Sequence, residues 1–189
     1  MRRQSSFRRV ALVASLVGLA LVMSGCGYNT LVSEQEQVDA GWSEVENQLQ
    51  RRNDLIPNLV STVKGFAAQE KEVLTQVTEA RSRVAGAGTP SETIEASNQL
   101  SGALSRLLVV VERYPELKSN QNFIRLQDEL AGTENRLAVA RKRYNDAVRA
   151  YNTTTKRFPT NLMAKLFGFD ARDYFEVPSA AKEAPAVEF

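Results

Sequence analysis

Residues 38–63 read VDAGWSEVENQLQRRNDLIPNLVSTV, and their apolar side chains recur every three or four positions. This spacing puts them along one face of an α-helix, and such a face must pack against other helices. The same spacing continues back to Tyr28 and forward to Val84. Three polar residues interrupt it: Gln35, Arg52 and Glu70. Nowhere does the chain alternate apolar and polar residues for long enough to predict a strand, so we expect an all-α domain.

Pro57 interrupts the helical pattern in a different way. Proline lacks the backbone N–H, clashes with the preceding turn and disfavours the helical conformation of Ile56. Either one helix kinks at Pro57, as the unbroken apolar spacing suggests, or the chain turns at Asn53–Asp54 and Asp54 caps a second helix. An unbroken helix would be about 85 Å long at 1.5 Å per residue, with too little chain left to cover it. We therefore expect a break or a very sharp bend at this proline.

The remaining helices are delimited by turn and capping residues. Residues 85–88, AGAG, predict a loop, and Thr89-Pro90-Ser91-Glu92 has the pattern of a capping box that starts a helix. That helix should end near Tyr114-Pro115, and a longer one should run from Ser119 or Asn120 to just before Phe158-Pro159. A short helix within residues 160–169 should end at a glycine. The prediction is an elongated, antiparallel up-and-down bundle of four long helical segments plus a short C-terminal helix.

The first 27 residues predict an exported, lipid-anchored protein. Four arginines within residues 1–9 precede an apolar run of about fourteen residues, which is too short to cross a ~30 Å hydrocarbon layer but is typical of a signal peptide. The next residues, Met23-Ser24-Gly25-Cys26, resemble the lipobox of bacterial lipoproteins. That resemblance implies cleavage before Cys26, acylation of its thiol and amine, and stable membrane anchoring by three acyl chains. Gly27 rather than aspartate follows the cysteine, which favours the outer membrane in a Gram-negative host.

Composition excludes several classes of chemistry. The 189 residues contain no histidine and one cysteine, so no His-dependent catalytic triad, His-ligated zinc site, multi-Cys metal site or internal disulfide can form. The net charge of +2 comes from 24 basic and 22 acidic residues. Without the four arginines of the leader the balance is negative, which gives no support to nucleic-acid binding. We expect no enzyme activity, catalytic residue, metal, cofactor or small-molecule substrate.

Two surfaces are candidates for binding. If the chain breaks at Pro57, two polar clusters lie at the end of the bundle far from the anchor and could contact an envelope protein. Their residues are Arg51, Arg52, Asp54, Asn58, Tyr114 and Lys118. The second surface is the apolar segment after the long last helix, which could rest on lipid or fold back onto the bundle. Its residues are Leu162, Leu166, Phe167 and Phe169.

A known family shows the same sequence pattern. The chain has Tyr28-Asn29-x-Leu31-Val32, then Gln48-Leu49-Gln50-Arg51-Arg52-x-Asp54-Leu55-Ile56-Pro57-Asn58-Leu59-Val60. It continues with Glu112-x-Tyr114-Pro115-x-Leu117-Lys118, Ala140-Arg141-x-x-Tyr144-Asn145 and Tyr151-Asn152. Over nearly the whole chain after residue 27, this strongly resembles the LemA family of bacterial envelope proteins. The resemblance implies a membrane-tethered helical bundle and no catalytic residues. Some relatives are linked to membrane remodelling or organelle biogenesis.

These observations together predict three segments. Residues 1–25 form a lipoprotein signal peptide, residues 26–175 a LemA-like helical bundle, and residues 176–189 a flexible tail rich in Ala, Pro and Glu. We expect a non-enzymatic interaction or scaffold module of the cell envelope that is anchored through Cys26 and faces the periplasm or exterior. It would bind an envelope protein or itself, and polar Arg52 or Glu70 on the apolar face could specify self-association. The alternative is a protein that senses or remodels the bilayer.

Overall fold

A computed structural model describes the backbone of residues 2–176 and the side chains of residues 27–176. Within these limits the chain forms two compact units. Unit 1 comprises residues 2–40 and 146–172, and unit 2 comprises residues 41–145 and 173–176. The predicted lipidation site, Cys26, and all of the predicted tail (176–189) except residue 176 lie outside the described side chains, so both remain predictions.

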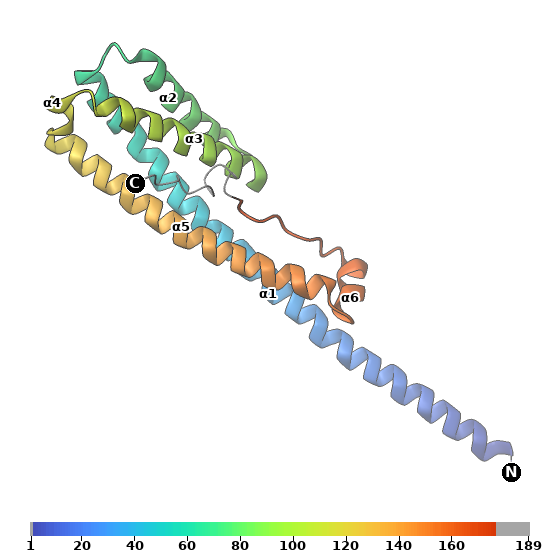
Figure 1. The fold of residues 1–189 in the computed structure, drawn as a ribbon. Helices are drawn as coiled ribbons and strands as arrows, with labels where there is room; N and C mark the ends of the chain where they lie inside the picture. The colour runs from blue at the N-terminus through green and yellow to red at the C-terminus, as the bar shows by residue number, and fades with distance from the viewer. Residues whose placement is uncertain (1, 177–189) are drawn as a thin grey trace, which may run out of the picture. The chain divides into compact units, whose positions relative to one another are not determined.

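Helices account for all the regular secondary structure of the described residues (Figure 1). They are α1 (Arg2–Phe66), α2 (Lys71–Gly86), α3 (Pro90–Val111), α4 (Pro115–Lys118), α5 (Gln121–Lys156) and α6 (Thr160–Phe167). The expected all-α class is therefore confirmed. Long helices α1 and α5 each contribute to both units.

Unit 2 contains four long helical segments that run alternately up and down. Contacts between α1 and α5 join Gly41 to Tyr144, Gln48 to Arg136 and Arg52 to Glu134. The residue numbers rise along one helix as they fall along the other, so the two helices are antiparallel. Helices α2 and α3 are antiparallel by the same criterion, through the pairs Gln76–Arg106 and Arg83–Gln99, and lie side by side (Figure 1).

The core of unit 2 lies among these helices. Its fully buried side chains include Ile56 and Leu59 from α1, Val77 from α2, Leu107 from α3 and Phe123 from α5. Ile56, Leu59 and Val77 belong to the three-four spacing of residues 28–84, so that part of the apolar face was predicted correctly. Burial of such a side chain contributes about 1.5–3 kcal/mol to stability.

Pro57 does not break the chain, so the alternative of a turn at Asn53–Asp54 is wrong and the alternative of one helix through Pro57 holds. Helix α1 continues through it to Phe66, and the first reversal is the turn formed by residues 67–70. The backbone hydrogen bond that proline cannot donate would have gone to the carbonyl of Asn53, four residues earlier. That carbonyl instead accepts a hydrogen bond of 3.2 Å from Nε of Arg81, on α2. A side chain from the next helix thus replaces the missing bond, and the helix can continue.

This replacement predicts an energetic coupling between Arg81 and Pro57. Arg81→Met should lower the free energy of unfolding by about 1–2 kcal/mol, because the buried Asn53 carbonyl loses its donor. In a Pro57→Ala background a backbone N–H returns, so the same change should cost less than about 0.5 kcal/mol. Urea unfolding of the four proteins in this double-mutant cycle measures the difference. If Arg81→Met lowered the free energy of unfolding equally in both backgrounds, the Arg81 side chain would not be replacing the hydrogen bond that Pro57 cannot donate.

Most helix ends follow the sequence signals. Thr89 and Glu92 form the expected capping box at the start of α3. The Asn120 side chain accepts hydrogen bonds from the backbone N–H groups of residues 122 and 123, which fixes the start of α5. At the end of α6, Gly168 has φ of 73°, a left-handed conformation that strongly favours glycine. The one-turn helix α4 was not predicted.

Candidate functional sites

Unit 1 carries an exposed apolar surface. It is made by α6, by Phe169 just after it and by Tyr28 of α1. The ring of Tyr28 meets Phe167 and Phe169 edge-on, with centroid distances of 5.0 and 5.7 Å. Leu166 is 71% exposed and Leu162 is 55% exposed. We call this group of five residues the α6 apolar surface. Phe167 and Phe169, two of the four residues proposed for membrane contact, thus meet at Tyr28, while Leu162 and Leu166 are exposed on another face of α6.

The opposite face of α6 is docked onto the rest of unit 1. Ala164 is buried, and Thr160 and Met163 lie against Gly27. Leu162 and Leu166 are four residues apart and therefore share the face that is left exposed. The two alternatives for this segment, resting on lipid and folding back, are therefore compatible: one face packs inward while the other stays available. The surrounding exposed cations, Lys156, Arg157 and Lys165, suit an anionic lipid surface.

The six residues proposed as a distal contact surface do not form one surface. The proposal assumed a chain reversal at Pro57, whereas α1 continues for nine residues beyond it. Tyr114 lies beside the turn after α1, where its hydroxyl donates to Glu70 and accepts from Gln69. Phe66, the last residue of α1, is 14 residues beyond Arg52, or about 21 Å along the helix axis, and the turn that contains Glu70 follows it.

The individual residues of this group have local roles. Arg51 and Asn58 are exposed, and Asp54 accepts a hydrogen bond from Gln50 within α1 instead of capping a second helix. Lys118 forms an ion pair with Glu112. The hydrogen bond to Glu70 raises the pKa of the Tyr114 hydroxyl above its ordinary value. Arg52 is buried, with 6% of its surface exposed, and cannot contribute to an external contact surface.

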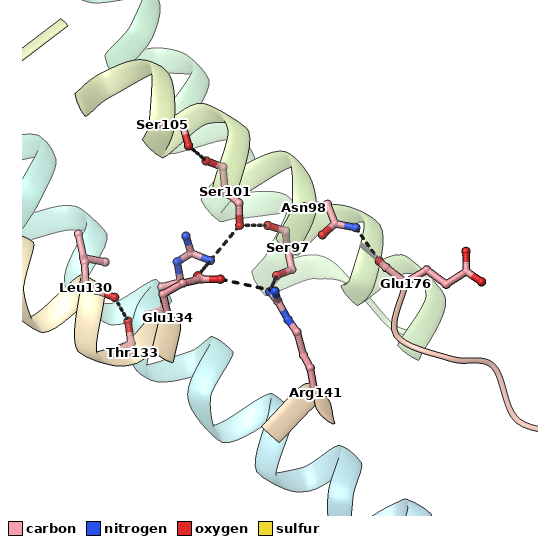
Figure 2. A network of polar contacts seen from close by, with 10 residues as sticks. Ser97, Asn98, Ser101, Ser105, Leu130, Thr133, Glu134, Arg141 and Glu176 are labelled. Atoms are coloured by element: carbon pink, nitrogen blue, oxygen red, sulfur yellow. Dashed lines mark hydrogen bonds and ion pairs between the residues drawn. The ribbon is translucent and has the colours of Figure 1, made fainter. Parts of the chain in front are cut away.

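Arg52 instead belongs to a polar network inside unit 2, drawn in Figure 2. Its Nη1 lies 2.7 Å from Oε2 of Glu134 and donates to the Ser101 hydroxyl at 3.0 Å. Arg141 reaches the other oxygen of the same carboxylate at 3.5 Å and donates to Ser97 at 3.2 Å. Burial lowers the pKa of both guanidinium groups, while the Glu134 charge opposes that shift. The Glu134 carboxylate therefore forms ion pairs with two largely buried arginines.

A cavity of about 400 Å³ adjoins the Arg52 end of this network. Its lining combines leucines from three helices with five polar residues: Arg52, Ser101, Ser105, Gln127 and Glu134. Sequence reasoning missed this site because its lining residues are spread from position 52 to position 134. The one local signal was Arg52 itself, which interrupts the apolar spacing. The described residues contain no cluster of acidic and cysteine side chains that could hold a metal ion.

The extended segment after α6 is held by two asparagines of α5. In unit 1, the Asn152 side chain accepts from the backbone N–H of Arg172 and donates to its carbonyl, at 2.9 and 2.8 Å. In unit 2, Asn145 makes the same pair of bonds to Phe175, at 2.8 and 3.0 Å. Phe175 is buried, and the Arg141 guanidinium lies 4.5 Å from its ring centroid. The Tyr-Asn pairs at 144–145 and 151–152 were visible in the sequence, but their role was not.

Removal of one asparagine should release the part of the segment that it holds. In an Asn145→Ala variant, the amide of Phe175 loses its acceptor and should exchange with solvent about tenfold faster or more. The amide of Arg172, held by Asn152, should be much less affected. Hydrogen exchange measured by NMR gives the exchange rates of both amides, Phe175 and Arg172. Unchanged protection at Phe175 would show that side-chain burial alone holds this segment.

Comparison with known proteins is consistent with the sequence resemblance. Residues 41–189 match the model of the LemA family. Magnetosome protein MamQ 2 of Paramagnetospirillum magneticum is 29% identical over 175 residues, covering 79% of this chain and 64% of that protein. Magnetosome protein MamQ of Magnetospirillum gryphiswaldense is 26% identical, with 78% and 64% covered. Protein LemA of Metamycoplasma hominis is 22% identical, with 72% and 63% covered. The chain thus spans less than two thirds of the length of each of these relatives.

Proposed function

Because the chain belongs to the LemA family, we propose that it is a lipid-anchored helical protein of the bacterial cell envelope whose unit 1 rests on the membrane surface. The observation that carries this proposal is the α6 apolar surface. It begins at Tyr28, two residues after the predicted lipidation site Cys26. Large apolar side chains that gather on an exposed surface favour contact with a partner or a membrane.

The position of this surface beside the proposed anchor favours the membrane. Acyl chains on Cys26 would keep Tyr28 within a few residues of the lipid headgroups. Aromatic side chains such as Tyr28 and Phe167 suit the boundary between headgroups and hydrocarbon. The described residues include no helix apolar and long enough to cross a bilayer.

The proposed role of unit 2 is to bind another envelope protein. We propose no enzymatic reaction for the chain. We also propose that, in a Gram-negative host, the protein is attached to the outer membrane. Two of the polar residues that interrupt the apolar spacing have partners within the chain: Arg52, on α1, binds Glu134, and Glu70, in the turn after α1, binds Arg113 and Tyr114. Their polarity thus needs no second copy to explain it.

Two measurements test the attachment. The intact mass of the protein purified from its native host should show cleavage before Cys26 and the added mass of acyl chains. Residues 26–189 with Cys26→Ser, which carry no acyl chain, should still float with vesicles that contain anionic phosphatidylglycerol. An unmodified Cys26 would overturn the anchor. Failure to float would overturn the contact between unit 1 and lipid.

A second candidate function is remodelling of the bilayer, and the shape of α6 favours it. This eight-residue helix has two exposed leucines on one face, which could enter one leaflet as a shallow wedge. Three of the relatives found are magnetosome proteins by name. Electron microscopy of vesicles mixed with the acyl-free protein separates the two functions. Tubules or smaller vesicles support remodelling, whereas unchanged vesicles with bound protein support attachment alone.

A further inference from the structure

The cavity beside Arg52 lies along α3 and α5, which supply most of its lining residues. Its volume of about 400 Å³ is large enough to hold several side chains. The apolar part of its lining is formed mainly by four leucines: Leu59, Leu104, Leu108 and Leu130. Leu108 is 39% exposed, so the apolar lining reaches the protein surface.

Most polar residues of the lining already have partners within the chain. Arg52 and Glu134 form an ion pair with each other. The hydroxyls of Ser101 and Ser105 each donate to a backbone carbonyl one turn earlier in α3. A charged occupant would therefore compete with an existing ion pair, whereas the partly exposed leucines still have apolar surface to bury. The lining thus favours apolar side chains as the occupant.

The last described residue, Glu176, lies on the same face of α3 that leads to this cavity. Its backbone carbonyl accepts a hydrogen bond of 3.3 Å from the Asn98 side chain, as Figure 2 shows. Residues three or four positions apart share one face of a helix. On α3, the residues that continue this face from Asn98 and line the cavity are Ser101, Ser105 and Leu108. Residues 177–189 therefore begin at one end of the face that lines the cavity.

The length of this segment matches the distance that it has to span. Leu108 is ten residues beyond Asn98, which is about 15 Å along the axis of α3. Phe189 is 13 residues beyond Glu176, and a flexible chain of that length has a root-mean-square end-to-end distance of about 20 Å. A linker whose length matches the span holds its end at an effective concentration in the millimolar range. A weak apolar contact is then sufficient for docking.

We propose that residues 187–189 dock in this cavity as an extended segment, with the side chains of Val187 and Phe189 against the leucines. Alternate residues of an extended chain point to the same side, so Glu188 between them faces water. Residues 179–186, SAAKEAPA, contain no large apolar side chain and serve as the linker. Every lining residue belongs to unit 2, so this docking is independent of the membrane contact proposed for unit 1.

Photocrosslinking in the native host tests this proposal on the complete protein. The probe is p-benzoylphenylalanine in place of Phe189, which keeps an aromatic ring at that position, and mass spectrometry locates the residues to which it links. We expect crosslinks within one chain to Leu104, Leu108 or Leu130. The same probe in place of Glu188 should give fewer of these crosslinks. If position 189 links only to a second copy or to another protein, or to no lining residue at all, the proposal is wrong.

One variant of the cavity and a matched control sharpen the test. Ala131 is exposed and lines the cavity, so Ala131→Trp should exclude the Phe189 ring and reduce the crosslinks about tenfold or more. Val139→Trp adds the same ring at an exposed position about two turns later on α5, outside the lining, and should leave them unchanged. Leu108→Ser, which removes partly exposed apolar lining, should also reduce the crosslinks to Leu104 and Leu130. Circular dichroism checks that each variant is folded. Crosslinks that Ala131→Trp and Leu108→Ser both leave unchanged would overturn the proposal.

Discussion

Replacement of Glu134 by Gln should lower the free energy of unfolding by about 2–3 kcal/mol, because it leaves two buried arginines without a carboxylate. Removal of one partner from a fully buried ion pair typically costs more, about 3–5 kcal/mol. The Glu134 side chain is 42% exposed, and solvent screening reduces the effect. Arg52 and Arg141 are themselves largely buried, so most of their desolvation cost would remain uncompensated.

Urea unfolding followed by circular dichroism measures this loss. Glu129→Gln is the matched control, since Glu129 is an exposed glutamate on the same helix and its replacement should change stability by less than about 0.5 kcal/mol. The double variant Glu134→Gln/Arg52→Met should recover more than half of the loss, because one uncompensated cation is gone. Equal stability of Glu134→Gln and the unmodified chain would show that the network carries no net electrostatic energy.

Replacement of Leu166 and Phe167 by serine should abolish most vesicle binding by the acyl-free chain of residues 26–189. Full burial of a Leu or Phe side chain contributes about 1.5–3 kcal/mol. Both side chains are more than half exposed in the protein, so much of that energy is available for contact with lipid. A combined loss of about 3 kcal/mol corresponds to a partition coefficient lower by about 100-fold.

The control for this prediction removes equally exposed apolar side chains from unit 2. Val109→Ser/Val139→Ser changes residues that are 71% and 52% exposed, and it should leave vesicle binding within about twofold. Flotation across a series of lipid concentrations gives both partition coefficients. An equal loss in the two double variants would indicate general adhesion of apolar surface to lipid and not a defined contact.

The sequence was sufficient for those features that depend on neighbours along the chain. Apolar spacing identified the buried face of each helix. Thr89 and Glu92, Asn120 and Gly168 marked helix ends because each acts on backbone groups within a few residues. The exposed face of α6 was also foreseen in part, since Leu162 and Leu166 are four residues apart.

The features that could not be predicted from the sequence depend on contacts between residues far apart along the chain. The hydrogen bond that Pro57 cannot donate is replaced by one from Arg81, which is 24 positions later. Arg52 was assigned to a contact surface because its partners, Ser101 and Glu134, come 49 and 82 residues after it. The segment clamped by Asn145 and Asn152 has no regular pattern of its own, so only the folded chain reveals it.

A nitroxide spin label at residue 166 shows whether α6 rests on the membrane. Leu166→Cys in the acyl-free chain carries the label, and Val109→Cys in unit 2 is the reference position. On addition of vesicles, we expect more collisions with oxygen and fewer with a water-soluble nickel complex at residue 166, with neither changed at residue 109. A label at residue 166 that stays fully accessible to the nickel complex while the protein is bound to vesicles would contradict it.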